Sequence, residues 1–109
     1  MSKLSVEPQK TAAFGAIGVG YSAIGTPFSN ACSILTVQNL TNAVLQFSFN
    51  GVDDHFPLAI DAKQTWDACA NRTNAQEGAF FSKGTQMYVK RIGTPTSGAV
   101  YVTVIYDAA

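Results

Sequence analysis

The sequence predicts an all-β protein, an antiparallel β-sandwich or jelly-roll-like barrel of six to seven strands with an extended glycine-rich N-terminal arm. From residue 31 onward, short apolar runs alternate with turn-forming residues, which is typical of a sandwich or barrel. Residues 1–30 are instead rich in glycine and alanine, and their large side chains do not recur at helical spacing. Because 109 residues suffice for one domain and not comfortably for two, we predict an arm over residues 1–30 and a β-sandwich domain over residues 31–109.

The predicted arm combines frequent glycines with isolated apolar side chains. Each glycine makes a regular helix less stable by about 1 kcal/mol relative to alanine, and the glycines concerned are Gly15, Gly18, Gly20 and Gly25. The isolated apolar side chains need a surface to lie on, and if the domain does not supply it, a neighbouring subunit does. We therefore predict a subunit interface that includes Phe14, Ile17, Val19, Tyr21 and Ile24.

Two strands open the predicted domain. Residues 34–40 form a run of β-branched and apolar residues that is closed by a turn signal. Residues 44–49 alternate between two faces, with Leu45, Phe47 and Phe49 on one of them. This period of two indicates a strand that buries one face.

A hairpin is predicted directly after the second strand. Asn50-Gly51 indicates a two-residue type I′ turn, because both central residues of that turn need positive φ. The partner strand is expected to begin near Phe56. Pro57 has no backbone N–H to donate, so we predict that this partner is an edge strand.

Three further strands are predicted in the rest of the domain. Residues 64–69 carry the only tryptophan, Trp66, and the polar stretch that follows is predicted to be a loop. Residues 85–92 and 100–106 are predicted strands because of their alternation and β-branched content. Both faces of the last strand are largely apolar, so it is either central with a second layer outside or packed against another chain. The predicted interface therefore also includes Tyr101 and Ile105.

The charge content of the chain is low and balanced. Charged residues make up 13% of the sequence, about half the ~25% of typical domains, and the formal net charge is zero. Such a composition favours association, so we expect other subunits to cover much of the surface. The densest basic spot, Lys90-Arg91 with Lys83 nearby, does not predict direct sequence-specific nucleic-acid binding, because adjacent strand residues point to opposite faces. Without a secretory signal or a run of about 20 apolar residues, we expect cytoplasmic synthesis and no membrane partner.

No catalytic, cofactor or metal site is predicted, and we expect a protein that is not an enzyme. Asp53, Asp54 and His55 are adjacent, but alternate side chains of an extended segment diverge, so we interpret them as the polar end of a hairpin. Cys69 and His55 lack the orienting partner and oxyanion hole that nucleophilic catalysis needs. In a reducing compartment, Cys32 and Cys69 are interpreted as small buried hydrophobic residues rather than a disulfide.

Four segments in a fixed order carry a resemblance to a known group of proteins. They are Val37-Gln-Asn-Leu-Thr-Asn42, Phe47-Ser-Phe-Asn-Gly-Val-Asp-Asp-His-Phe56, Gly78-Ala-Phe-Phe-Ser-Lys-Gly-Thr-Gln-Met-Tyr-Val-Lys90 and Thr94-Pro-Thr-Ser-Gly-Ala-Val-Tyr-Val-Thr-Val-Ile-Tyr106. In this order they resemble the small β-sandwich structural proteins of tailed-bacteriophage virions. The resemblance implies a ring or adaptor component of the neck or tail, or a head decoration protein, that is assembled in the host cytoplasm and located in the virion. It implies that the partners are copies of the chain itself and other virion proteins, and it implies no catalytic residues.

Two interpretations of function remain open at this point. The first is a structural subunit that assembles through the arm and through strand edges. It predicts that deleting Ser2 to Asn30 leaves a folded domain that no longer assembles. The second is a glycan-binding module of a tail appendage that uses Trp66 and the loop over residues 71–78. Specific binding on a glycan array that Trp66→Ala abolishes would favour the second interpretation.

Overall fold

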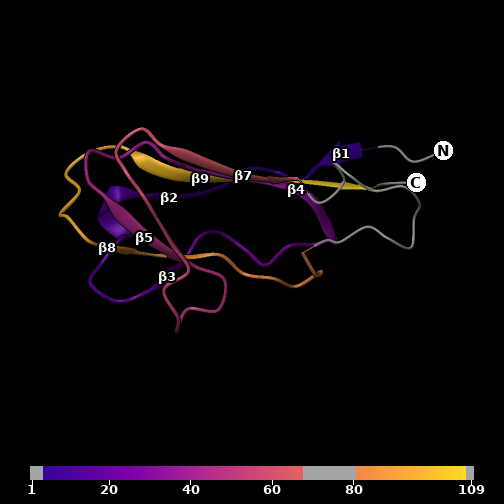
Figure 1. The fold of residues 1–109 in the computed structure, drawn as a ribbon, viewed down its shortest axis with the longest axis horizontal. Helices are drawn as coiled ribbons and strands as arrows, with labels where there is room; N and C mark the ends of the chain where they lie inside the picture. The colour runs from indigo at the N-terminus through magenta and orange to yellow at the C-terminus, as the bar shows by residue number, and fades with distance from the viewer. Residues whose placement is uncertain (1–3, 68–80, 108–109) are drawn as a thin grey trace.

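The computed structural model describes residues 4–67 and 81–107, and it confirms an antiparallel β-sandwich (Figure 1). The five-stranded sheet has the order β1-β9-β4-β7, with β2 also paired to β9, and comprises β1 (Leu4–Val6), β2 (Lys10–Ala13), β4 (Cys32–Asn39), β7 (Lys63–Asp67) and β9 (Ala99–Asp107). The four-stranded sheet has the order β3-β8-β5-β6 and comprises β3 (Ser22–Ala23), β8 (Tyr88–Arg91), β5 (Leu45–Ser48) and β6 (Phe56–Leu58). A short 3-10 helix, η1 (Phe14–Ala16), follows β2.

The last strand, β9, lies inside the five-stranded sheet. It pairs with β4 on one side, where Val37 lies opposite Val102, and with β1 and β2 on the other. Successive side chains of a strand point to opposite faces. Val100, Val102 and Val104 therefore point inward and are buried between the sheets, while the alternate residues point outward. The four-stranded sheet covers only one of the two apolar faces of this strand.

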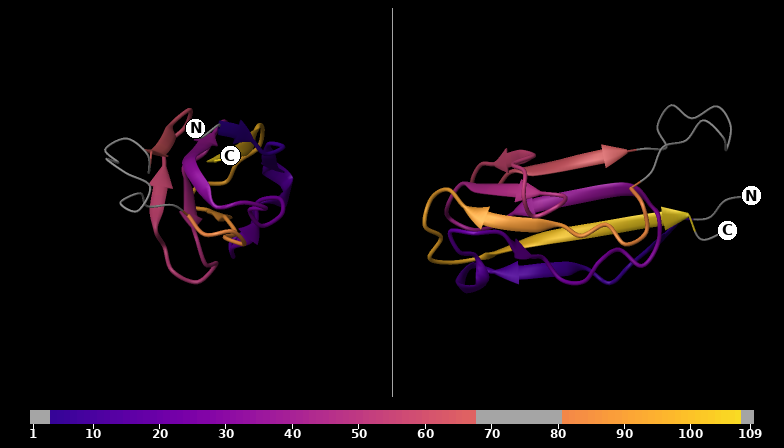
Figure 2. Two further views of the ribbon diagram at one scale, coloured as in Figure 1. Left: turned by 90° about the vertical axis from the view of Figure 1, so that its right-hand side faces the viewer. Right: turned by 90° about the horizontal axis from the view of Figure 1, so that it is seen from below.

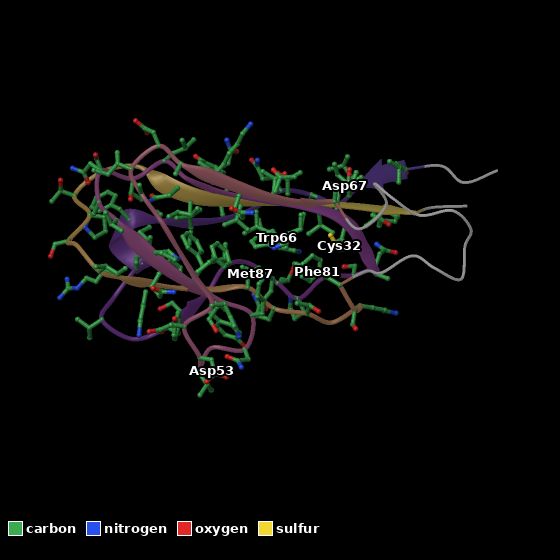
Figure 3. All side chains as sticks on the ribbon, in the orientation of Figure 1. Cys32, Asp53, Trp66, Asp67, Phe81 and Met87 are labelled. Atoms are coloured by element: carbon green, nitrogen blue, oxygen red, sulfur yellow. The ribbon has the colours of Figure 1, made fainter. Side chains whose placement is uncertain are left out.

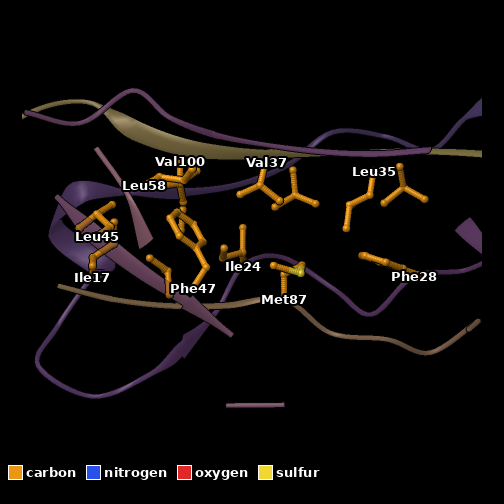
Figure 4. Close-up of a cluster of buried hydrophobic side chains, with 14 of the residues drawn as sticks. Ile17, Ile24, Phe28, Leu35, Val37, Leu45, Phe47, Leu58, Met87 and Val100 are labelled. Atoms are coloured by element: carbon orange, nitrogen blue, oxygen red, sulfur yellow. The ribbon is translucent and has the colours of Figure 1, made fainter. Parts of the chain in front are cut away.

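The hydrophobic core lies between the two sheets (Figure 4). Leu35 and Val37 on β4 point towards Phe28 and Met87 on the opposite side. Burying a large apolar side chain contributes roughly 1.5–3 kcal/mol to stability. The largest fully buried apolar side chains are Phe28, Phe47, Ile24, Leu35, Leu45 and Met87. Two of these six, Ile24 and Phe28, come from the segment that was predicted to be an arm, so that segment is an integral part of the core.

Residues 4–30 belong to the sandwich, and the prediction of a separate arm is wrong for them. β1 and β2 pair with β9, and β3 pairs with β8. Ile24 is fully buried and Ile17 is only 5% exposed. The segment is extended, as predicted, because the edges of β8 and β9 supply its backbone partners and the core supplies its apolar surface. A glycine-rich composition disfavours a helix, but it does not reveal which surface the segment covers.

A buried ion pair joins the loop between β1 and β2 to the loop before β4. The Glu7 carboxylate accepts hydrogen bonds from the backbone N–H groups of Ser29 and Asn30 at 3.1 and 2.9 Å and from the Asn30 side chain at 3.1 Å. Lys10 Nζ lies 3.6 Å from this carboxylate and donates to the Thr26 hydroxyl at 3.2 Å. Both charged side chains are buried, so these partners offset the loss of their hydration.

β5 and β6 form the predicted hairpin with a different turn. β6 begins at Phe56 and is the edge strand that Pro57 predicted. The predicted type I′ turn is wrong, because Asn50 does not have positive φ and residues 49–55 all lie between the strands. Instead, the side chains of Ser48 and Asn50 accept the next backbone N–H groups of the loop at 2.9 to 3.1 Å. These side-chain bonds replace the backbone bonds of a tight turn.

The bounds of the other predicted strands also differ from those observed. The strands predicted over residues 34–40, 44–49 and 100–106 are observed as β4, β5 and β9, with bounds that differ by one or two residues. β8 covers only residues 88–91 of the predicted 85–92, because the carbonyl groups of Thr85 and Met87 accept isolated hydrogen bonds from the N-terminal segment. The strand predicted from residue 64 is observed as β7 and begins one residue earlier. The rest of that prediction and the loop predicted after it fall on residues 68–80, which lie outside the described residues.

Candidate functional site

The five N-terminal residues predicted to form a subunit interface occupy different environments. Ile17 and Ile24 are in the core, so their predicted role at an interface is wrong. The sandwich itself supplies the apolar surface that we had assigned to a neighbour. Val19 is 75% exposed and Phe14 is 39% exposed, so both lie at the surface. Tyr21 is partly buried and is bonded within the chain.

Tyr21 connects the N-terminal segment to the loop over residues 49–55. Its hydroxyl donates to the Asp54 carboxylate at 2.5 Å, and Lys90 Nζ lies 3.0 Å from the same carboxylate. Lys90 also lies 4.7 Å from the centre of the Tyr21 ring. The hydrogen bond from Tyr21 and then the contact with Lys90 lower the pKa of Asp54. Burial and then the neighbouring Asp54 raise the pKa of Tyr21, which stays protonated and keeps its place as a donor.

The remaining predicted interface residues, Tyr101 and Ile105, lie on the outer face of the five-stranded sheet. The pairing of β4 with β9 places Tyr101 opposite Gln38 and Ile105 opposite Ile34. All four side chains are partly exposed. The pairings of β1, β2 and β7 extend the same face on both sides. We define the outer face by the side chains of Val6, Thr11, Ile34, Thr36, Gln38, Lys63, Thr65, Asp67, Tyr101, Thr103 and Ile105.

A row of threonines crosses the middle of the outer face. Thr103 lies opposite Thr36, and Thr36 lies opposite Thr65, with 3.1 Å between the hydroxyl oxygens of the last two. Within the outer face as defined, the charged side chains are Lys63 and Asp67, both on β7. Hydroxyl and apolar groups lose less hydration free energy on burial than charged groups do. The centre of this face is therefore suited to contact with another protein surface, because charged residues are depleted where such contacts are fully buried.

Trp66 belongs to an aromatic cluster between the two sheets (Figure 3). Its ring meets those of Phe49, Phe56 and Phe81 edge-on, with 5.6, 4.9 and 6.0 Å between ring centres. Phe49 also stacks on Phe81 at 5.2 Å. We did not predict this cluster, because Phe81 is separated in sequence from the other rings and is held beside them by the pairing of its backbone with Cys32 on β4. A tryptophan with three aromatic neighbours contributes to packing.

The polar residues considered for chemistry serve the local structure. His55 Nδ1 accepts the Phe49 backbone N–H at 2.9 Å, and Asp53 accepts a hydrogen bond from an asparagine in the same loop at 2.8 Å. Cys32 is buried, and its thiol donates to a backbone carbonyl at 3.1 Å, whereas Cys69 lies outside the described residues. Over residues 4–67 and 81–107, no three His, Cys, Asp or Glu side chains are grouped in a way that suits a metal ion.

Comparisons of the chain with protein-family models, with curated proteins and with solved structures find no match. The part of the chain that the structure describes contains no helix of the length and apolar character needed to cross a membrane. The functional interpretation therefore depends on the geometry of the molecule. The two features that bear on it are the outer face and the edge of the sheet at β7.

Proposed function

We propose that the chain is a structural subunit of a tailed-bacteriophage virion that assembles into the neck or tail region through the outer face and through β-strand edges. The outer face carries the proposal, since its centre presents threonine, glutamine, tyrosine and isoleucine side chains and its charges lie on β7. The low charge content and zero net charge of the whole chain support the same conclusion, because a subunit covered by neighbours needs little surface charge. The resemblance of the four sequence segments to small structural proteins of tailed-bacteriophage virions supports the choice of this kind of particle.

A neighbouring subunit that covers the outer face gains hydrophobic free energy. Burial of apolar area contributes roughly 25 cal/mol per Å², and Ile34, Tyr101 and Ile105 supply that area. The threonine hydroxyls both donate and accept hydrogen bonds, so they can find partners in the contact. A head decoration protein is the alternative within the same class, since it uses the same kind of surface and differs in its position and copy number.

A charge at the centre of the outer face tests the proposal. We expect Thr36→Lys to reduce the amount of the chain in purified virions by at least about tenfold, because burying an unpaired charge costs several kcal/mol. Val52→Lys is the matched control, since Val52 is 79% exposed in the loop after β5 and away from the outer face. Circular dichroism verifies that both variants are folded. Incorporation of Thr36→Lys at the level of the control would contradict the proposed use of this face.

Glycan binding is the alternative from another functional class, and the structure favours it less. Trp66, the aromatic residue assigned to it, packs against three rings of its own chain. A glycan array with the wild-type chain and with Trp66→Phe, which preserves an aromatic ring, tests this alternative. Specific binding that the substitution removes would favour a glycan-binding module over a structural subunit.

A further inference from the structure

The strand β7 forms an edge of the five-stranded sheet (Figure 2). One side of it pairs with β4, and no strand among the described residues pairs with the other side. Three of its side chains, those of Lys63, Thr65 and Asp67, point to the outer face and are exposed. An edge strand of this kind can pair with another strand through its backbone.

The hydrogen bonds between β4 and β7 determine which backbone groups point to the open side. The Asn39 N–H donates to the Ala62 carbonyl at 2.9 Å, immediately beside the opposed pair of Gln38 and Lys63. Asn39 and Ala62 are therefore a hydrogen-bonded pair. Because hydrogen-bonded and non-hydrogen-bonded pairs alternate along antiparallel strands, the next bonded residues of β7 are Gln64 and Trp66, and their backbone groups point towards β4. The N–H and carbonyl groups of Lys63, Thr65 and Asp67 therefore point away from β4.

The charges of β7 are symmetric about its middle residue. Lys63 lies two residues before Thr65, and Asp67 lies two residues after it. When two copies of β7 run antiparallel with Thr65 opposite Thr65 of the second copy, each Lys63 lies opposite an Asp67. Residues directly opposite have Cβ atoms roughly 4.5–5.5 Å apart, which is within reach of an ion pair. The same three residues carry the outward-pointing backbone groups, so this register forms about six inter-chain hydrogen bonds.

We propose that a second copy of this chain binds to β7, so that the two five-stranded sheets join across a two-fold axis at Thr65. A two-fold interface uses the same surface patch on both copies, so the patch must be complementary to itself. The order lysine, threonine, aspartate meets this condition, because each Lys63 faces an Asp67 of the other copy. Shifting the register by two residues places Lys63 opposite Thr65 and leaves its charge without an opposite partner, so the charges select one register. Asp67 also makes an interaction in its own chain, and a carboxylate accepts several hydrogen bonds at once. This pairing rests on the proposed function, because it identifies a second copy of the chain as one partner of the assembling subunit.

Charge reversal tests the pairing in solution. Sedimentation equilibrium over a range of concentrations is expected to show a dimer for the wild-type chain. Lys63→Asp alone and Asp67→Lys alone place like charges opposite each other at two positions per dimer, so we expect each to raise the dimer Kd by at least about tenfold. The double variant with both reversals restores two opposite-charge pairs and is expected to recover the wild-type Kd.

A proline at position 65 tests the backbone part of the inference. Thr65→Pro removes an N–H that points away from β4, so the pairing of β4 with β7 is retained while the pairing of two copies loses its central bonds. We expect a folded monomer by circular dichroism and sedimentation. A wild-type chain that is monomeric throughout, a dimer insensitive to the single reversals and to Thr65→Pro, or a double variant that stays weak would each overturn the inference. A chain that is present in virions and monomeric in solution would leave the proposed function standing and remove only the pairing at β7.

Discussion

Glu7→Gln removes the negative charge of the buried carboxylate that contacts both the loop before β4 and the Lys10 ammonium group. The glutamine side chain retains one carbonyl oxygen that can accept a hydrogen bond. Its NH₂ group is a donor and faces the N–H donors of Ser29 and Asn30, so it cannot replace the second carboxylate oxygen. Lys10 stays buried without its counter-ion. Removing one partner of a buried ion pair costs about 3–5 kcal/mol. Since the free energy of unfolding of a native domain is about 5–15 kcal/mol, the substitution removes a large part of the stability.

Urea unfolding measures this loss. With a slope of about 1–3 kcal/mol per molar urea, we expect the midpoint of Glu7→Gln to fall by about 2 M. Asp53→Asn is the matched control, because Asp53 is an exposed acid in a loop, and its midpoint should change by no more than the equivalent of about 0.5 kcal/mol. Adding Lys10→Met to Glu7→Gln removes the unpaired charge and should recover part of the loss. A Glu7→Gln variant within about 1 kcal/mol of the wild type would refute the energetic role of the pair.

Three further predictions follow from contacts inside the sandwich. Deleting residues 2–30 removes β1, β2, β3 and four core side chains, those of Ala12, Ile17, Ile24 and Phe28, so the remainder should lack a cooperative thermal transition, and a cooperative transition in it would contradict the observed fold. Asn39→Leu leaves the carbonyl groups of Ala43 and Leu58 and the Thr41 N–H without their buried partner, so it should destabilise by at least about 2 kcal/mol in urea, whereas a neutral effect would show that water replaces the side chain. Tyr21→Phe should move the pKa of Asp54 up towards 3.8 in a carboxyl NMR titration, and an unchanged midpoint would contradict the bond. Because the folded pKa of Asp54 is lowered, its contribution to stability is present above pH 3.8 and is lost as the pH falls through the lower folded pKa.

The strands that could be predicted are those in which burial of one face imposes a period of two. Leu45 and Phe47 alternate with more polar residues because only one face of β5 lies on the core. Pro57 predicted an edge because the missing donor is tolerated only there. The turn at Asn50 could not be predicted from the dipeptide alone, since the side chains of Ser48 and Asn50 accept hydrogen bonds from backbone N–H groups and so favour a longer loop.

The N-terminal segment was mispredicted for a physical reason that applies to many short edge strands. β1 and β2 are held by pairing with β9, at the other end of the chain, and nothing local in the segment identifies that partner. Glu7 and Lys10 are charged residues in a largely uncharged region, but only the fold shows that they are buried against each other.

The candidate site was predicted in part. Tyr101 and Ile105 could be found because a strand that is apolar on both faces needs a cover on both faces. The symmetric placement of Lys63 and Asp67 about Thr65 is visible in the sequence. It indicates pairing with a second copy only because the order of strands places β7 at an edge of the sheet. Sheet order depends on contacts that are distant in sequence, so periodicity alone does not predict it.

Counting copies of the chain in purified virions tests the central claim most directly. Quantitative mass spectrometry against the major capsid protein gives the number of copies per particle. We expect about six to a dozen copies or a small multiple, because rings and appendages of the neck and tail have cyclic symmetry. Hundreds of copies would identify the alternative, a head decoration protein. The absence of the chain from the particle would contradict its role as a virion subunit.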